Sequence, residues 1–249
     1  LNDLGKLQEA EISAQKAIEL NPDFAKAHCN LGGILCNLGR FLEAEISTQK
    51  AIELNPNLVE AHLNFGNILC NLGKLQEAEI SICKAIALNP DCESAYLNLG
   101  NILSDLGKLQ EAEISTRKAI ELNPNYPIAH SNLGGILNDL GKLQEAEIST
   151  RKAIELNPDC EGAHLNLGNI LKDFGKLDES FHAYLRVIEI NPTHSSIYGI
   201  VTRFLRESDP SKLNNSKLKK ILNILLDRND VPHKELFKAF KFIYRNKII

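Results

Sequence analysis

The stretch from Gly73 to Ser81 reads GKLQEAEIS, and the same nine residues recur without change at 5–13, 107–115 and 141–149. Around this stretch, glycines and prolines return every 34 residues along the chain. The series are Gly5, Gly39, Gly73, Gly107, Gly141 and Gly175, and Pro22, Pro56, Pro90, Pro124, Pro158 and Pro192. Chance does not align so many residues, so the chain is built from an internal repeat.

Each repeat carries two apolar patterns with helical spacing. In residues 59–92, apolar side chains from Ala61 to Leu72 predict a first helix, and those from Leu75 to Leu88 predict a second. Neither helix can bury its apolar face alone, and stacking of successive antiparallel pairs removes this problem. The sequence therefore predicts a solenoid.

The ends of these helices have recognisable signals. Asn57 is the expected N-cap of the first helix, with Glu60 completing a capping box. Gly73 is expected to end that helix in the left-handed conformation. Pro90 stops the second helix, and Asp91 is expected to cap the next first helix.

The pattern resembles the tetratricopeptide repeat (TPR) family. In residues 59–92 the matching positions are Phe65, Gly66, Gly73, Ala78, Ala85 and Pro90. The resemblance implies an all-α fold, a right-handed α-solenoid of antiparallel helix pairs known as a TPR superhelix. Full units are expected at 25–58, 59–92, 93–126, 127–160 and 161–194, after a partial unit at 1–24 that holds the tail of a first helix and a second helix.

Two features of the repeat indicate tight packing. Small residues recur where helices must approach closely, and they are Gly32, Gly66, Gly100, Gly134 and Gly168, and Ala44, Ala78, Ala112 and Ala146. The slot that holds Trp in the family is filled by His28, His62, Tyr96, His130 and His164. Because Tyr replaces His there, this slot indicates packing and not metal ligation.

The distribution of charge separates the C-terminal part from the repeats. Residues 1–194 hold 16 Lys and Arg against 27 Asp and Glu, a net charge of −11, whereas residues 195–249 carry a net charge of +7. In this basic segment we expect helices from Ser195, from Ser216 to Asp227 and after Pro232, the last with an apolar face of Leu236, Phe237, Phe240, Ile243 and Tyr244. It is expected to cap the solenoid; a basic surface for an anionic partner and a connector into a further domain remain open.

The chain contains no Met, which suggests a fragment or a processed product. In the 34-residue register Leu1 aligns with Leu35, so the first unit is expected to lack most of its first helix. The apolar edge left there is expected to face solvent or a neighbouring molecule, which makes self-association possible. No run of about 18 apolar residues predicts a membrane span.

No catalytic pattern is found in the sequence. The six cysteines include no Cys-x-x-Cys pair, and no phosphate-binding loop, nucleophile elbow or His-Glu-x-x-His motif occurs. We therefore expect no enzymatic activity, no metal and no cofactor. The cysteines are interpreted as small, partly buried residues in a reducing cytoplasm.

Asparagine recurs two residues before the glycine of each first helix, at Asn30, Asn64, Asn98, Asn132 and Asn166, and one residue after it at Asn67, Asn101 and Asn169. An Asn amide offers the donors and the acceptor that match a peptide bond. The row resembles the asparagine ladder in the TPR superhelix of O-GlcNAc transferase, which implies binding of an extended peptide through its backbone. Two alternatives remain open: the Asn side chains tie neighbouring helices together, or duplication copied a neutral residue.

Acidic residues lie near this row, at Asp105, Asp139 and Asp173. They are expected either to favour basic peptide side chains or to be solvated helix ends, where a carboxylate opposes the helix dipole. The slots that hold Lys or Arg in chaperone-binding TPR proteins are here Cys29, Leu63, Leu97, Ser131 and Leu165. Binding of acidic chaperone tails is therefore not expected.

The sequence predicts a protein–protein interaction scaffold in the cytoplasm whose concave groove binds an extended peptide, with no nucleic acid or membrane as partner. The competing hypothesis is a substrate-recruiting module at the N-terminus of a larger enzyme. It comes from the layout, which is similar to bacterial chains in which a TPR array leads through a helical connector into a transferase or methyltransferase domain.

Overall fold

The computed structural model describes residues 2–245, and all regular structure in this part of the chain is helical. The first seven helices are α1 (Asn2–Leu20), α2 (Ala25–Asn37), α3 (Phe41–Leu54), α4 (Val59–Asn71), α5 (Leu75–Leu88), α6 (Glu93–Asp105) and α7 (Leu109–Leu122). They are followed by α8 (Pro127–Asp139), α9 (Leu143–Leu156), α10 (Glu161–Asp173), α11 (Leu177–Ile190), α12 (Ser195–Glu207), α13 (Asn215–Leu226) and α14 (Phe237–Tyr244). The predicted all-α fold is confirmed.

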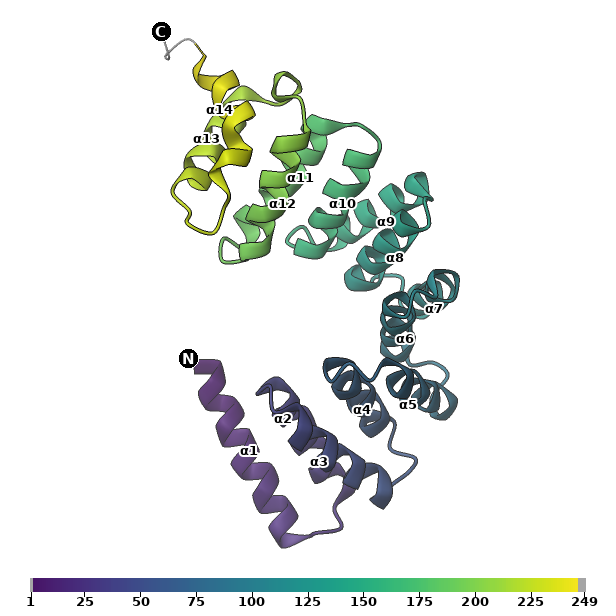
Figure 1. Cartoon of the computed structure of the whole chain (residues 1–249). Helices are drawn as coiled ribbons and strands as arrows, with labels where there is room; N and C mark the ends of the chain where they lie inside the picture. Colours follow the sequence, from purple (N-terminus) through teal and green to yellow (C-terminus); the bar gives the residue numbers. More distant parts are fainter. Residues whose placement is uncertain (1, 246–249) are drawn as a thin grey trace. The chain divides into compact units, whose positions relative to one another are not determined.

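The chain forms two compact units, one ending at Pro124 and the other beginning at Asn125. The first contains α1 to α7 and the second α8 to α14 (Figure 1). Within each unit a short turn joins the two helices of a repeat, so they pack as an antiparallel pair, and successive pairs stack. We call α2, α4, α6, α8 and α10 the first helices, and α3, α5, α7, α9 and α11 the second helices.

The glycine turns have the conformation that the sequence predicts. Gly73 has a φ of +74°, and its equivalents Gly39, Gly107, Gly141 and Gly175 lie within a degree of it. After Gly73, the Lys74 amide donates to the Leu69 carbonyl at 2.8 Å. This bond satisfies a carbonyl at the end of α4 and directs the chain back along the pair.

The predicted N-caps of the first helices are wrong. Leu58, and not Asn57, precedes the first residue of α4, and no side chain caps this helix. The Asn57 amide instead donates to Oδ1 of Asn55 at 3.1 Å, and the Asp91 amide likewise donates to Oδ1 of Asn89 at 3.2 Å. The Asn before each proline therefore organises the connection as a local turn, which leaves the following polar residue outside the helix.

The break predicted at Gly5 is also wrong, because α1 runs without interruption from Asn2 to Leu20. Gly5 is not among the glycines with positive φ. At the true turns, the amide after the glycine bonds to a carbonyl five residues earlier, as from Lys74 to Leu69. The equivalent carbonyl for Gly5 belongs to Leu1, which is outside the described residues, and the backbone at Gly5 continues as helix.

Glycine in the first helix brings the two helices of one repeat together. A Cβ atom at Gly66 would lie 2.5 Å from Cδ1 of Ile82, and at Gly100 it would overlap Oγ1 of Thr116. The predicted close approach is confirmed, but it lies within a repeat and not between stacked repeats. A serine reinforces it, since Ser81 on α5 donates to the His62 carbonyl on α4 at 2.9 Å.

The histidines in the Trp slot join consecutive repeats. Nε2 of His62 lies 2.9 Å from the Pro56 carbonyl, and His28 and His164 make the same contact with Pro22 and Pro158. Tyr198 on α12 occupies the equivalent position and donates to the Pro192 carbonyl at 2.9 Å. These contacts agree with a packing role, and they show that α12 continues the repeat as a first helix.

The largest apolar cluster of the second unit connects α11 to the three C-terminal helices. Phe181 and Phe204 stack with ring centroids 5.9 Å apart, and Tyr184 packs edge-on against Phe204 at 5.4 Å. Leu222 on α13 and Ala239 on α14 are buried in the same cluster. The predicted apolar face of the last helix is partly wrong: residues 233–236 form a 3₁₀ turn that alters the helical register, and Phe237 is exposed.

We predict that Gly100→Leu lowers the free energy of unfolding by about 1–3 kcal/mol, because the new side chain must displace Thr116 in a filled contact. Gly199→Leu on α12 is the matched control, since no atom lies within 4 Å of its Cβ position. Removing a glycine from an open helical site is expected to raise stability by up to about 1 kcal/mol. Urea unfolding followed by circular dichroism measures both, and equal effects would reject the proposed contact.

Candidate functional site

The Asn row lies on the first helices, and three of its side chains, those of Asn64, Asn98 and Asn166, bond to the preceding first helix of the same unit. Nδ2 of Asn64 on α4 donates to the Cys29 carbonyl on α2 at 3.4 Å and lies equally close to the Cys29 sulfur. In the second unit, Nδ2 of Asn166 on α10 donates to the Ser131 carbonyl on α8 at 2.9 Å. Both amides therefore connect stacked repeats.

The partner of each Asn depends on the residue after the glycine in the preceding helix. Where that residue is Gly33 or Gly135, the next Asn passes over it to the backbone, and a Cβ atom there would lie 3.4 Å from the Asn nitrogen. Where it is Asn67, Nδ2 of Asn98 donates to its Oδ1 at 2.9 Å. The two glycines that interrupt the second Asn series thus open a path to a carbonyl. The alternation of Gly and Asn at this position is visible in the sequence, but the role of the glycines was not predicted from it.

These bridging bonds use only part of each amide. A carboxamide has two N–H donors and an oxygen with two lone pairs. Within residues 2–245 no group donates to Oδ1 of Asn64 or Asn166, and both side chains are half-buried and not enclosed. Asn30 is exposed and makes no hydrogen bond through its side chain in the described chain. The row therefore retains acceptors, and one complete amide, for another molecule.

The other predicted Asn residues differ in their surroundings. Asn132 is half-buried on α8, and Asn101 is exposed on α6. Asn169 on α10 accepts a hydrogen bond from the Tyr184 hydroxyl at 2.8 Å, so its oxygen is partly occupied within its own repeat. Burial raises the pKa of Tyr184 to about 12, which keeps this hydroxyl protonated as the donor.

The predicted acidic residues are exposed at the last position of their helices, with Asp105 ending α6, Asp139 ending α8 and Asp173 ending α10. In α6 and α8 the last turn contains no basic residue that would balance the carboxylate. Burial raises the pKa of the Cys70 thiol on α4, and the nearby Asp105 carboxylate raises it further. The charge of Asp105 on α6 therefore affects the pKa of a residue on the neighbouring first helix, α4.

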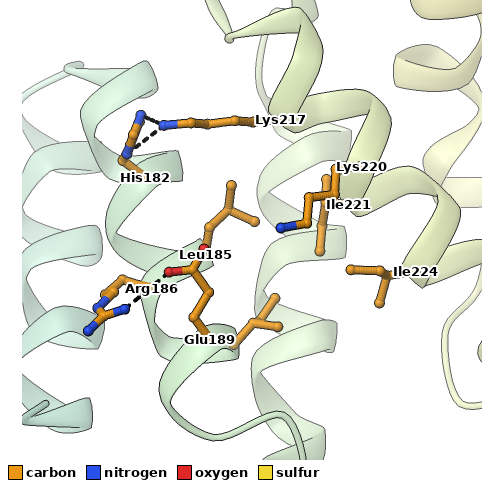
Figure 2. Close-up of a pocket in the computed structure, with 9 residues that line it drawn as sticks. His182, Leu185, Arg186, Glu189, Lys217, Lys220, Ile221 and Ile224 are labelled. Carbon is orange, nitrogen blue, oxygen red and sulfur yellow. Dashed lines mark hydrogen bonds and ion pairs between the residues drawn. The ribbon is translucent and has the colours of Figure 1, made fainter.

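One enclosed pocket lies away from the Asn row, between α11 and α13 in the second unit (Figure 2). It has a volume of about 290 Å³, with Leu185 and Ile221 on its walls. Lys217 contacts His182, and Arg186 pairs with Glu189 at 3.2 Å. Most of its polar groups are thus paired with each other, and the pocket marks where α13 lies beside α11.

A wider hollow of about 820 Å³ lies in the first unit, lined by residues of α1, α2 and α3 that include His28 and Leu35. It does not include the Asn row either. No group of three or more His, Cys, Asp or Glu residues in the described part of the chain could hold a metal ion. None of the described helices is both long and apolar enough to cross a membrane.

Solved structures with a similar fold include proteins described as TPR proteins. The structure of YrrB, described as a TPR protein with an unusual peptide-binding site, is 24% identical, with a TM-score of 0.57 over 75% of this chain and 96% of YrrB. TTC0263 from Thermus thermophilus is 24% identical, with a TM-score of 0.64 over 73% of this chain and 98% of its own. A chain of the APC/C hetero-tetramer Cut9–Hcn1 is 17% identical, with a TM-score of 0.76 over 95% of this chain and 46% of that one.

These identities are low, and the structural similarities show the fold alone. No curated protein sequence matches the chain. The tetratricopeptide repeat family, however, matches residues 1–24, 13–46, 48–80, 94–126, 116–148 and 162–194, which together span well over half of the chain. With the paired helices, the glycine turns and the helix contacts described above, these matches show that the chain belongs to the tetratricopeptide repeat family.

Proposed function

We propose that the chain is a protein-interaction scaffold and that its first helices bind an extended peptide through the Asn row. Membership of the TPR family supports the scaffold role. The observation that carries the finer proposal is the incomplete use of the row: Asn64 and Asn166 each keep a free acceptor, and Asn30 keeps its whole amide.

The bridging bonds prepare the row for binding. A bond from Asn64 to the Cys29 carbonyl restrains the amide, so the peptide does not have to order it. The remaining N–H and the oxygen can then meet the C=O and N–H of a peptide bond. Because these partners occur in every peptide bond, such recognition depends little on the peptide's side chains.

The second unit carries Asn132, Asn166 and Asn169, and the first unit adds Asn67 and Asn101 to the proposed set of amides. The carboxylates of Asp105, Asp139 and Asp173 add negative charge at the end of the same helices. We propose that they select peptides with Lys or Arg side chains. An exposed carboxylate gives modest affinity, so its contribution falls with added salt.

We also propose that residues 195–249 cap the repeats at 1–194. The burial of Leu222 and Ala239 in one apolar cluster with residues of α11 and α12 supports this proposal, and the cap begins with α12, which packs in the position of a further first helix. A cap that covers the apolar surface of the last pair keeps a solenoid soluble.

We predict that replacing Asn64 and Asn98 together by Ala weakens peptide binding about tenfold or more, because each amide contributes hydrogen bonds of about 1 kcal/mol. Peptides would first be selected from an unstructured library on the wild-type chain. Isothermal titration of these peptides then compares the variant with wild type, and circular dichroism verifies its helix content. Unchanged affinity would reject the ladder.

Recognition of the peptide backbone also predicts how changes in the peptide alter its affinity. N-methylation of peptide amides removes donors without changing side chains, so it is expected to reduce affinity for wild type and to have less effect on the double variant. Exchange of neutral peptide side chains is expected to change affinity little. If side-chain exchange changes the affinity and N-methylation does not, the peptide is recognised through its side chains.

We predict that Asn166→Ala lowers the free energy of unfolding by about 0.5–1.5 kcal/mol, because it removes a bond between stacked helices. Asn30→Ala is the matched control and is expected to be neutral or slightly stabilising, since Asn30 makes no such bond and Ala favours helix. Denaturant unfolding measures both changes. If Asn30→Ala is equally destabilising, the row is purely structural.

We predict that Asp105→Asn, combined with Asp139→Asn and Asp173→Asn, weakens binding of Lys-rich peptides and leaves binding of neutral peptides unchanged. The difference arises from charge and should shrink as salt concentration rises, since exposed charges are screened. Titrations at low and high salt measure it. An equal loss for neutral peptides would mean that these residues do not select by charge.

A further inference from the structure

The outer surface of the first unit exposes a row of isoleucines. One occurs on α1 and on each second helix of this unit, with Ile12 on α1, Ile46 on α3, Ile80 on α5 and Ile114 on α7, and their exposed fractions are 65%, 71%, 71% and 70%. A single exposed apolar residue needs no explanation, but four equivalent ones in one unit form a patterned surface. Ile148 repeats the feature in the second unit.

The residue before each isoleucine is a glutamate that is less exposed than the isoleucine itself. The side chains of Glu45 and Glu79 are only 18% and 25% exposed. They are held by ion pairs with the next turn, from Glu45 to Lys74 at 2.6 Å and from Glu79 to Lys108 at 2.8 Å. The repeat thus shields a charged side chain and exposes its apolar neighbour, which is the reverse of what stability of the isolated chain favours.

Charged rows flank the isoleucines on the same helix faces. Three residues before each isoleucine lies a glutamate, and four residues after it lies a lysine; these are Glu43, Glu77 and Glu111, and Lys50, Lys84 and Lys118. Residues at i, i+3 and i+7 share one side of a helix. The surface therefore presents three rows, Glu, Ile and Lys, on α3, α5 and α7.

We propose that this surface, which we call the Glu–Ile–Lys face, binds the same face of a second copy of the chain. A two-fold axis along the direction of stacking sets the facing helices antiparallel. It brings the Ile row onto the Ile row and each Glu row onto the partner's Lys row. An axis along the helices would place like charges together, so the rows select one arrangement.

Two further observations support an association role. The copy at 39–47 differs from the nine-residue string at three positions, yet it keeps Glu43 and Ile46. On α11 the isoleucine position is His182, and there the chain supplies its own neighbour, because Lys217 of α13 contacts His182. Isoleucine thus occupies this position on α1, α3, α5, α7 and α9, whereas a polar residue occurs where the chain's own α13 makes contact.

The proposal concerns the second helices and is independent of the Asn row on the first helices. Sedimentation velocity of the full chain over a wide concentration range tests it. Wild type is expected to form dimers, and Ile46→Glu with Ile80→Glu to remain monomeric. Leu20→Glu is the matched control, since Leu20 is 80% exposed at the end of α1 outside the rows, and it should dimerise as wild type does.

Charge exchange tests whether the Glu and Lys rows pair across the contact. A variant with Glu43, Glu77 and Glu111 changed to Lys, and another with Lys50, Lys84 and Lys118 changed to Glu, should each be monomeric because like rows face each other. Their mixture should form a heterodimer. Adding Ile80→Glu to both should abolish it, which separates recognition by this face from attraction between net charges.

A wild-type chain that stays monomeric at every concentration would overturn the proposal. So would dimers that persist in the double Ile variant, since another surface, such as the edge at α1, would then hold them. Failure of the mixed charge variants to associate would reject the pairing of Glu rows with Lys rows. Circular dichroism of each variant verifies that its helices are intact.

Discussion

The contact of a first-helix glycine with its second helix is the constraint on which each repeat depends. Gly66 and Gly100 leave room for Ile82 and Thr116 at distances that no Cβ atom would permit. The approach also brings Ser81 within hydrogen-bond distance of the His62 carbonyl. With the pair set at this separation, its remaining apolar faces can be buried only against the next pair, which makes stacking a consequence of the local contact.

Stacking positions the Asn row both for contacts between helices and for the proposed peptide binding. The first helices lie close enough for Asn64 and Asn166 to reach the backbone of the helix before them, and the amides are restrained as a result. The hypothesis that the Asn residues tie helices together and the hypothesis that they bind a peptide are therefore compatible. The two roles use different atoms of the amide. The nitrogen that donates to the preceding helix fixes the orientation of the oxygen, which no described group occupies.

The same chain carries distinct surfaces on its two kinds of helix. The first helices present neutral amides and carboxylates, whereas the second helices of the first unit present isoleucines between rows of opposite charge. A peptide and a second copy would thus use different residues. Binding at one surface would therefore not exclude binding at the other.

Much of the fold followed from the spacing of residues. The helix pairs, the left-handed glycines and the small-residue contacts were predictable because each depends on neighbours in the sequence or on a strict 34-residue period. The caps at Asn57 and Asp91 were not, since Asn55 and Asn89 compete for the same amides and this competition depends on the geometry before each proline. Phe237 was misplaced because a 3₁₀ turn shifted the register of its helix.

The sequence by itself determined the repeat, its helices and the positions of the candidate amides. Only the tertiary structure decided which acceptors those amides reach, because Asn64 and Asn98 occupy the same position in their repeats and yet donate to different partners. It also decided that Glu79 is shielded while Ile80 is exposed. That choice depends on Lys108, which comes from the next repeat, and a helical pattern read along one helix does not contain it.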